Sequence, residues 1–135
     1  MGALAGFHHV KLPVTDVERS SAWYQRVLGL TLEIDFVEDG VLMGVALGNA
    51  DNSVGLALRQ DAARAAALAG FDPVALAVPT HSELKHWRDR LDLLGEPHGG
   101  IVAGHIGWAI VGLHDPDGIE IRLYTLEKHD AEASH

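Results

Sequence analysis

The chain has 135 residues, 47% of them hydrophobic and 21% charged, with a formal net charge of −9 at pH 7, which is typical of one soluble globular domain able to bury a core. The acidic balance argues against nucleic acid as a partner, because binding a phosphate backbone needs clustered cations, and the absence of cysteine excludes disulfides, thiolate metal ligands and a cysteine nucleophile. No stretch has the length of a membrane span or the pattern of a secretory signal, so we expect a cytoplasmic protein without a membrane partner.

The first part of the chain predicts a strand, a helix and three more strands. Residues 7–14 alternate between apolar and polar positions, as a half-buried strand does. Asp16 is placed to cap a helix over residues 17–28, and Gly29 is placed to end it. Strands follow at residues 31–37, 41–47 and 53–60, and Asp39-Gly40 is a strong signal for a hairpin between the first two.

The second part predicts the same order after an alanine-rich linking helix at residues 61–70. A strand at residues 73–78 precedes Thr80 and Glu83, whose spacing is that of a capping box. The next helix carries an apolar stripe of Leu84, Trp87, Leu91 and Leu94. Three strands at residues 98–102, 106–113 and 119–125 follow, with an Asp-Pro-Asp-Gly turn at 115–118 and a polar tail at 127–135.

An internal repeat relates the two parts. A shift of 64 positions places Val10, Leu12 and Val14 on Val74, Leu76 and Val78, and Trp23 on Trp87. The repeat predicts an α+β chain of two βαβββ modules in tandem, residues 5–60 and 71–126. Each sheet is expected to pack its helix on one face, and the two curled mixed sheets are expected to form a cleft with their other faces.

Two motifs resemble those of a known superfamily. The first begins with His9-Val10, continues through Leu12, Val14 and Asp16, and includes Glu18-Arg19-Ser20, Trp23-Tyr24 and residues 27–30; the second is the closing segment 115–121. Together they resemble the vicinal oxygen chelate superfamily, which includes glyoxalase I, fosfomycin resistance proteins, extradiol dioxygenases and bleomycin-resistance binding proteins. The resemblance implies the glyoxalase/bleomycin-resistance fold, and a homodimer, since relatives commonly complete the cleft by pairing modules within or between chains.

The resemblance also implies four positions for metal ligands. They fall on His9, near Gly55, on Pro73 and on Arg122, where a glutamate is usual. Glycine and proline side chains cannot ligate a metal, and a guanidinium repels one, so we favour no metal cofactor. A divalent metal needs displaced ligands: Glu120, on the same strand face as Arg122, or a histidine among His98, His105 and His114. His8 is expected to face away from His9, because neighbours in a strand point to opposite sides.

The predicted cleft face carries cations and aromatic groups that suit a ligand. Its members are His9, Lys11, Arg59, Arg122 and Tyr124, and Trp108 either packs in the protein or stacks on the ligand. An anionic or carbonyl-rich molecule complements these cations unless Glu120, Glu33 or Asp35 counters them. We expect the guanidinium of Arg122 to replace the family's ion by gripping a carboxylate or enol oxygen beside His9.

Two classes of function follow. The first is a metal-independent protein that binds a small molecule, of the sequestration or resistance type. The alternative is an enzyme: a glyoxalase- or dioxygenase-like metalloenzyme with displaced ligands, or a metal-independent lyase or isomerase that uses His9 as its base. The sequence identifies no other catalytic residue and does not name the substrate.

Overall fold

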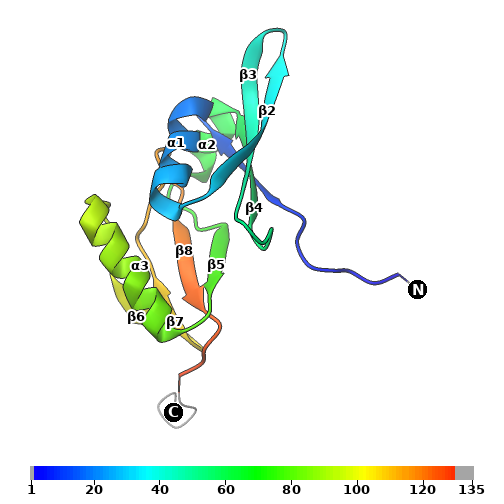
Figure 1. Ribbon diagram of the computed structural model, residues 1–135. Helices are drawn as coiled ribbons and strands as arrows, with labels where there is room; N and C mark the ends of the chain where they lie inside the picture. The colour runs from blue at the N-terminus through cyan, green and yellow to red at the C-terminus, as the bar shows by residue number, and fades with distance from the viewer. Residues whose placement is uncertain (1, 130–135) are drawn as a thin grey trace. The chain divides into compact units, whose positions relative to one another are not determined.

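The computed structural model describes residues 2–129, which form two four-stranded sheets and three helices (Figure 1). The chain divides into two compact units at Ala67 and Leu68, within the second helix. The elements in chain order are β1 (Val10–Val14), α1 (Val17–Leu28), β2 (Thr31–Glu38), β3 (Val41–Gly48), β4 (Gly55–Gln60), α2 (Ala62–Leu68), β5 (Val74–Val78), α3 (His81–Leu94), β6 (Ile101–Ala103), β7 (Trp108–Ile110) and β8 (Ile121–Thr125).

Both sheets have the same strand order. The first is β1-β4-β3-β2 and the second β5-β8-β7-β6. In each, the first strand of the unit runs parallel to the last, and the other neighbours are antiparallel. The shared topology confirms the prediction of two tandem βαβββ modules in an α+β fold.

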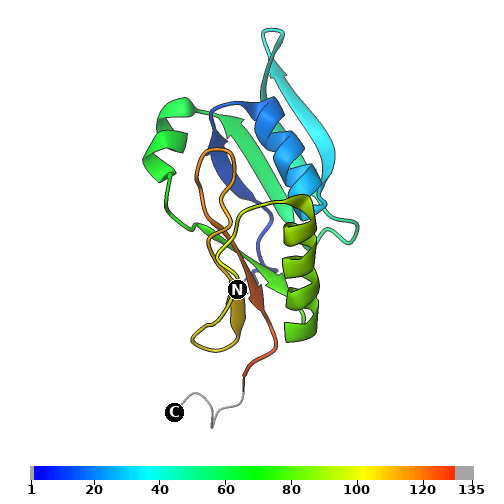
Figure 2. The same cartoon turned by 90° about the vertical axis from the view of Figure 1, so that its left-hand side faces the viewer.

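In the first unit, one face of the sheet packs against α1 (Figure 2). Leu12 and Val14 are buried on this face, as are Tyr24 and Val27 of the helix. Their burial confirms the predicted apolar face of the opening strand. Because side chains alternate along a strand, Lys11 and Pro13 lie on the opposite face.

The two long helices begin and end at the predicted signals. Asp16 accepts a hydrogen bond from the Arg19 amide at 3.1 Å, and Thr80 accepts one from the Glu83 amide at 3.1 Å. The helices end where Gly29 and Gly95 adopt the left-handed φ angles of 70° and 71°, which cost glycine little. Leu84 and Leu91 of α3 are fully buried, which confirms the centre of the predicted stripe.

The strands at the far edge of the second sheet are shorter than the sequence predicts. Residues 98–102 and 106–113 were expected to be strands, whereas β6 and β7 have three residues each. Gly112 has a φ of 73°, and its amide donates to the Glu120 carboxylate at 3.2 Å instead of to a neighbouring strand. The regular ladder therefore stops before Gly112.

Of the polar tail predicted for residues 127–135, only residues 127–129 lie within the described part of the chain. None of the helices found in residues 2–129 has the length and hydrophobicity needed to cross a membrane.

We expect the two N-caps to contribute similarly to stability. Asp16→Ala and Thr80→Ala should each lower the free energy of unfolding by about 1 kcal/mol, because each leaves a first-turn amide without its acceptor. Urea denaturation followed by circular dichroism measures this. Asp16→Asn, which keeps an acceptor oxygen, is the control and should cost a few tenths of a kcal/mol or less; a control as damaging as Asp16→Ala would contradict the capping explanation.

Candidate ligand-binding site

The face of the first sheet opposite α1 contains a hollow of about 520 Å³. All four strands contribute to it, and a floor of small residues lies in its centre. Gly44 pairs with Arg59 and with Phe36, while Ala57 pairs with Lys11. The hollow is lined by His9, Lys11, residues 35–38, Gly44, Val45 and residues 57–59.

Three of the predicted site residues therefore share one hollow: His9, Lys11 and Arg59. Sequence reasoning missed Phe36, which is 44% exposed and whose ring lies 3.7 Å from the position of a Cβ on Gly44. The sequence did contain a signal for Phe36. Ile34 and Phe36 alternate along β2 opposite the small residues Ala46 and Gly44, and cross-strand partners lie on the same face of a sheet.

The two cations of the hollow differ in their partners. Arg59 pairs with Glu38 at the surface, and this hydrogen bond lowers the pKa of the Glu38 carboxyl below its ordinary value. The partners considered from the sequence for such cations were Glu33, Asp35 and Glu120, and none of these is the residue that Arg59 meets. Lys11 is exposed and forms no ion pair with any residue in the described range 2–129, so its ammonium group is available to a ligand.

A second hollow of about 280 Å³ adjoins the first and shares His9, Phe36 and Ala57 with it. His8 also lines it, and the Nδ1 atoms of His8 and His9 lie 2.9 Å apart. The expectation that these histidines face opposite sides was wrong. Its premise fails because β1 begins only at Val10, so strand alternation does not govern the two residues before it.

In the second unit, Arg122 is held by two carboxylates. Its Nε donates to Glu120 at 2.7 Å and its terminal nitrogen pairs with Asp72 at 3.2 Å. The Glu120 side chain is 13% exposed, and its pKa lies below the ordinary value mainly because it accepts the Arg122 hydrogen bond. The guanidinium therefore already has a partner within the protein, and one of its two carboxylates, Glu120, is a partner considered from the sequence. The expected contact between Arg122 and a carboxylate or enol oxygen of a ligand stays a prediction.

Tyr124 and Trp108 lie on opposite faces of the second sheet. Tyr124 pairs with Ala109, while Ile110, two residues from Trp108, pairs with the buried Leu123 on the helix side. The Trp108 ring stacks on His81, the first residue of α3, at 4.0 Å between centroids and 7° between planes. Arg122 and Tyr124 share the face that Trp108 does not, so a ligand role for Trp108 would need a different surface.

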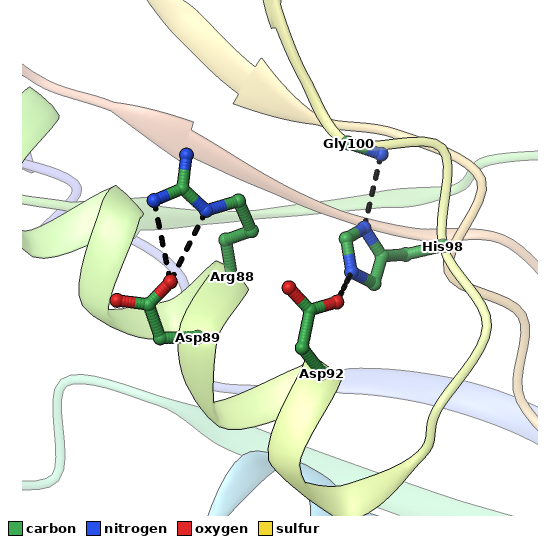
Figure 3. A network of polar contacts seen from close by, with 5 residues as sticks. All are labelled: Arg88, Asp89, Asp92, His98 and Gly100. Carbon is green, nitrogen blue, oxygen red and sulfur yellow. Dashed lines mark hydrogen bonds and ion pairs between the residues drawn. The ribbon is translucent and has the colours of Figure 1, made fainter.

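His98, one of the alternative metal ligands, has both ring nitrogens engaged (Figure 3). Nδ1 accepts the Gly100 amide at 3.0 Å, and Nε2 lies 2.6 Å from the Asp92 carboxylate. A nitrogen that accepts an N–H carries no proton, so the proton lies on Nε2 and is donated to Asp92. The arrangement ties the loop after α3 to the helix and leaves no lone pair for a metal.

Comparison with known proteins places the chain in a family. A sequence model of the Glyoxalase/Bleomycin resistance protein/Dioxygenase superfamily matches residues 6–123. The chain belongs to this superfamily. A search of curated protein sequences finds no match.

Solved structures share the fold at low sequence identity. A glyoxylase/bleomycin resistance protein/dioxygenase domain from Frankia sp. EAN1pec is 19% identical, with a TM-score of 0.73 over 98% of this chain and 100% of the other. Lactoylglutathione lyase from Agrobacterium tumefaciens is 14% identical, with a TM-score of 0.73 over 93% and 96% of the two chains. TnmS3, an antibiotic binding protein from Streptomyces sp. CB03234, is 18% identical, with a TM-score of 0.72 over 93% and 98%.

The residues at the superfamily's metal positions do not fit a divalent ion in this chain. His9 offers an imidazole, but a Cβ at Gly55 would lie 2.8 Å from the carbonyl oxygen of His8, so no larger residue fits there unchanged. Pro73 offers no donor, and Arg122 is a cation bound by carboxylates. Within residues 2–129, no three His, Asp or Glu side chains lie close enough together to form a metal site. Glu120, the proposed substitute, is occupied by Arg122.

The Glu120–Arg122 contact should give the protein a specific acid sensitivity. Since the folded-state pKa of Glu120 lies below its ordinary 4.5, its ionised form stabilises the fold above that pH. This contribution is lost as the pH falls through the folded value. Arg122→Met should lower the free energy of unfolding at pH 7 by about 1 kcal/mol or less, because the pair is partly exposed.

The same substitution should also shrink the loss of stability between pH 7 and pH 3, measured by urea denaturation at each pH. Arg88→Met, which removes a surface arginine beside Asp89 on α3, is the matched control and should leave the acid profile unchanged. An Arg122→Met profile parallel to that of the unmodified chain would show that the contact contributes nothing in solution.

Proposed function

We propose that the chain is a cytoplasmic protein that binds a small anionic or carbonyl-rich molecule on the open face of its first sheet, for sequestration or resistance. The hollow of about 520 Å³ carries this proposal, because it combines an apolar floor with the imidazole of His9 and the ammonium group of Lys11, which has no ion-pair partner among residues 2–129. A cavity of this size, mostly apolar with few polar groups, is typical of small-molecule sites.

The pairing of the other cations supports the choice of Lys11 as the anion-binding group. Arg59 and Arg122 each have a carboxylate partner within their own unit. A ligand that took either guanidinium would have to displace that partner. Lys11 needs no such displacement, so its contact with an anion carries less cost.

The binding of a model anion tests this role. 2-Naphthoate, whose fluorescence reports binding, should bind more weakly to Lys11→Met by about tenfold, the effect of losing one charge-assisted contact at a partly exposed site. Lys85→Met, on the exposed surface of α3, is the matched control and should bind as the unmodified chain does. The neutral analogue 2-naphthamide should be insensitive to Lys11→Met. Equal loss for both molecules would show that the substitution damages the hollow rather than removing a charge.

We propose further that binding needs no metal ion, since the residues at the superfamily's metal positions do not form a ligand set. Treatment with a chelator should leave naphthoate affinity unchanged, as measured by the same fluorescence titration. Metal analysis of protein purified without chelator is the complementary measurement. Stoichiometric zinc, nickel, iron or manganese would favour the metalloenzyme alternative instead.

A homodimer is part of the proposal, and the exposed edge strand supports it. All eight residues of β2 are exposed, including Leu32, Ile34, Phe36 and Val37, and Val41 follows on β3. An eight-residue edge strand that exposes several apolar side chains favours association with another chain.

Light scattering at about 10 μM, which populates a dimer whose dissociation constant is about 1 μM or lower, should give twice the 14.5 kDa mass of one chain. Val41→Glu should shift the mass towards the monomer, because it puts a charge on the exposed hairpin. Leu93→Glu, at an exposed leucine on α3, should not. A monomeric unmodified chain would refute the dimer without touching the ligand-binding proposal.

A further inference from the structure

One carboxylate on the open face of the first sheet has no partner. Three carboxylates border the two hollows, those of Glu33, Asp35 and Glu38. Glu38 pairs with Arg59. Asp35 lies opposite Val45, which is buried on the α1 side, so the Asp35 side chain is directed to that side as well. Glu33 forms no hydrogen bond or ion pair with any residue in the described range 2–129.

The Glu33 carboxylate lies above β3. A Cβ on Gly48 would lie 3.0 Å from the Cδ of Glu33 and 3.3 Å from its Oε2. The preceding residue, Leu47, buries its side chain on the α1 side, so a Cβ on Gly48 would point to the open face. The carboxylate therefore turns back from the edge strand β2 and occupies the space above Gly48, where it lines the smaller hollow.

Lys11 and Glu33 do not meet, because they belong to opposite edges of the sheet. The strand order is β1-β4-β3-β2, so three strand spacings, about 14 Å, separate β1 from β2. The carboxylate above Gly48 of β3 is still two spacings, about 10 Å, from β1. The open face thus presents an unpaired cation in one hollow and an unpaired anion in the adjoining one.

We propose that the smaller hollow binds a protonated amine, and that the ligand of this face is a flat zwitterion with an amine at one end and an acid group at the other. The inference rests on the proposed binding function of the same face and adds the second charged group of the ligand. An ammonium group donates charge-assisted hydrogen bonds to the Glu33 carboxylate, while the acid group binds at Lys11.

The surroundings of Glu33 suit the rest of such a ligand. Phe36 and Ala57 border both hollows and supply apolar surface for a flat body between the two charges. The face of the Phe36 ring, which is 44% exposed, also attracts a cation. A metal ion fits this place less well, because within residues 2–129 no three His, Asp or Glu side chains lie close enough together to hold one.

The amine site can be tested with 6-(aminomethyl)-2-naphthoate and 6-methyl-2-naphthoate in fluorescence titrations. At about pH 7 the aminomethyl group is protonated and the acid group of both compounds is ionised. The aminomethyl compound should bind about tenfold more tightly, the effect of one charge-assisted contact at a partly exposed site. The methyl compound has the same ring and acid group, so the comparison isolates the ammonium group.

Glu33→Gln should reduce this preference to less than about twofold without weakening the methyl compound. Glu18→Gln, which removes the same charge from the exposed surface of α1, is the matched control and should leave the preference unchanged. Gly48→Ala keeps the charge of Glu33 but displaces its carboxylate, and it should also reduce the preference. A preference that survives either Glu33→Gln or Gly48→Ala would overturn the proposal.

The outcomes separate this inference from the proposed function. Lys11-dependent binding of the methyl compound, without a preference for the aminomethyl one, would overturn the amine site and leave the proposed function standing. 2-(Aminomethyl)naphthalene, which has no acid group, tests the amine site alone. Its binding should be weakened by Glu33→Gln and not by Lys11→Met, and this result would support the amine site even if Lys11 binds no anion. Failure of both amines to bind would overturn the amine site.

Discussion

The parallel pairing of the first and last strands of each module is the constraint on which the site depends. In the first module, Val10 pairs with Leu56 and Lys11 with Ala57, although 46 positions separate the partners. This register puts His9 beside Gly55 and sets Lys11 next to the small floor of the hollow. A slip by one residue would turn every side chain of β1 to the other face, so the buried positions of Leu12 and Val14 also fix the place of Lys11 in the hollow.

The local features of the fold could be predicted from the sequence because each depends on neighbouring residues. Asp16 and Thr80 cap helices through contacts three residues away, and Gly29 ends a helix through its own backbone angle. The internal repeat at a shift of 64 positions then predicted that both modules have the same strand topology. The end of β7 could not be predicted, because Gly112 takes a left-handed φ and its amide donates to the Glu120 carboxylate, eight positions later in the chain.

The charges of the candidate site were harder to predict than its position. Strand parity correctly grouped Lys11 with Arg59, yet the partner of Arg59 is Glu38, which lies 21 positions away on the edge strand. The strand register shifts between Phe36 and Val37, just before Glu38, and no pattern in the sequence predicts this shift. The direction of the His8 side chain was mispredicted for a similar reason, because strand alternation was assumed for a residue that precedes β1. Such errors concern side-chain direction, which a displacement of one residue reverses.

The distribution of burial explains how residues on the open face of the first sheet can vary while the fold keeps its structure. The buried side chains of the first sheet lie on the α1 side, where Leu12, Leu47 and Leu58 are nearly inaccessible to solvent. The opposite face carries Lys11, Ala57 and His9, which contribute little to that core. Substitution on the open face therefore changes the chemistry of the hollow at small cost in stability. One scaffold can in this way serve lyases, resistance proteins and binding proteins, each defined by a few residues on a face that the core does not need.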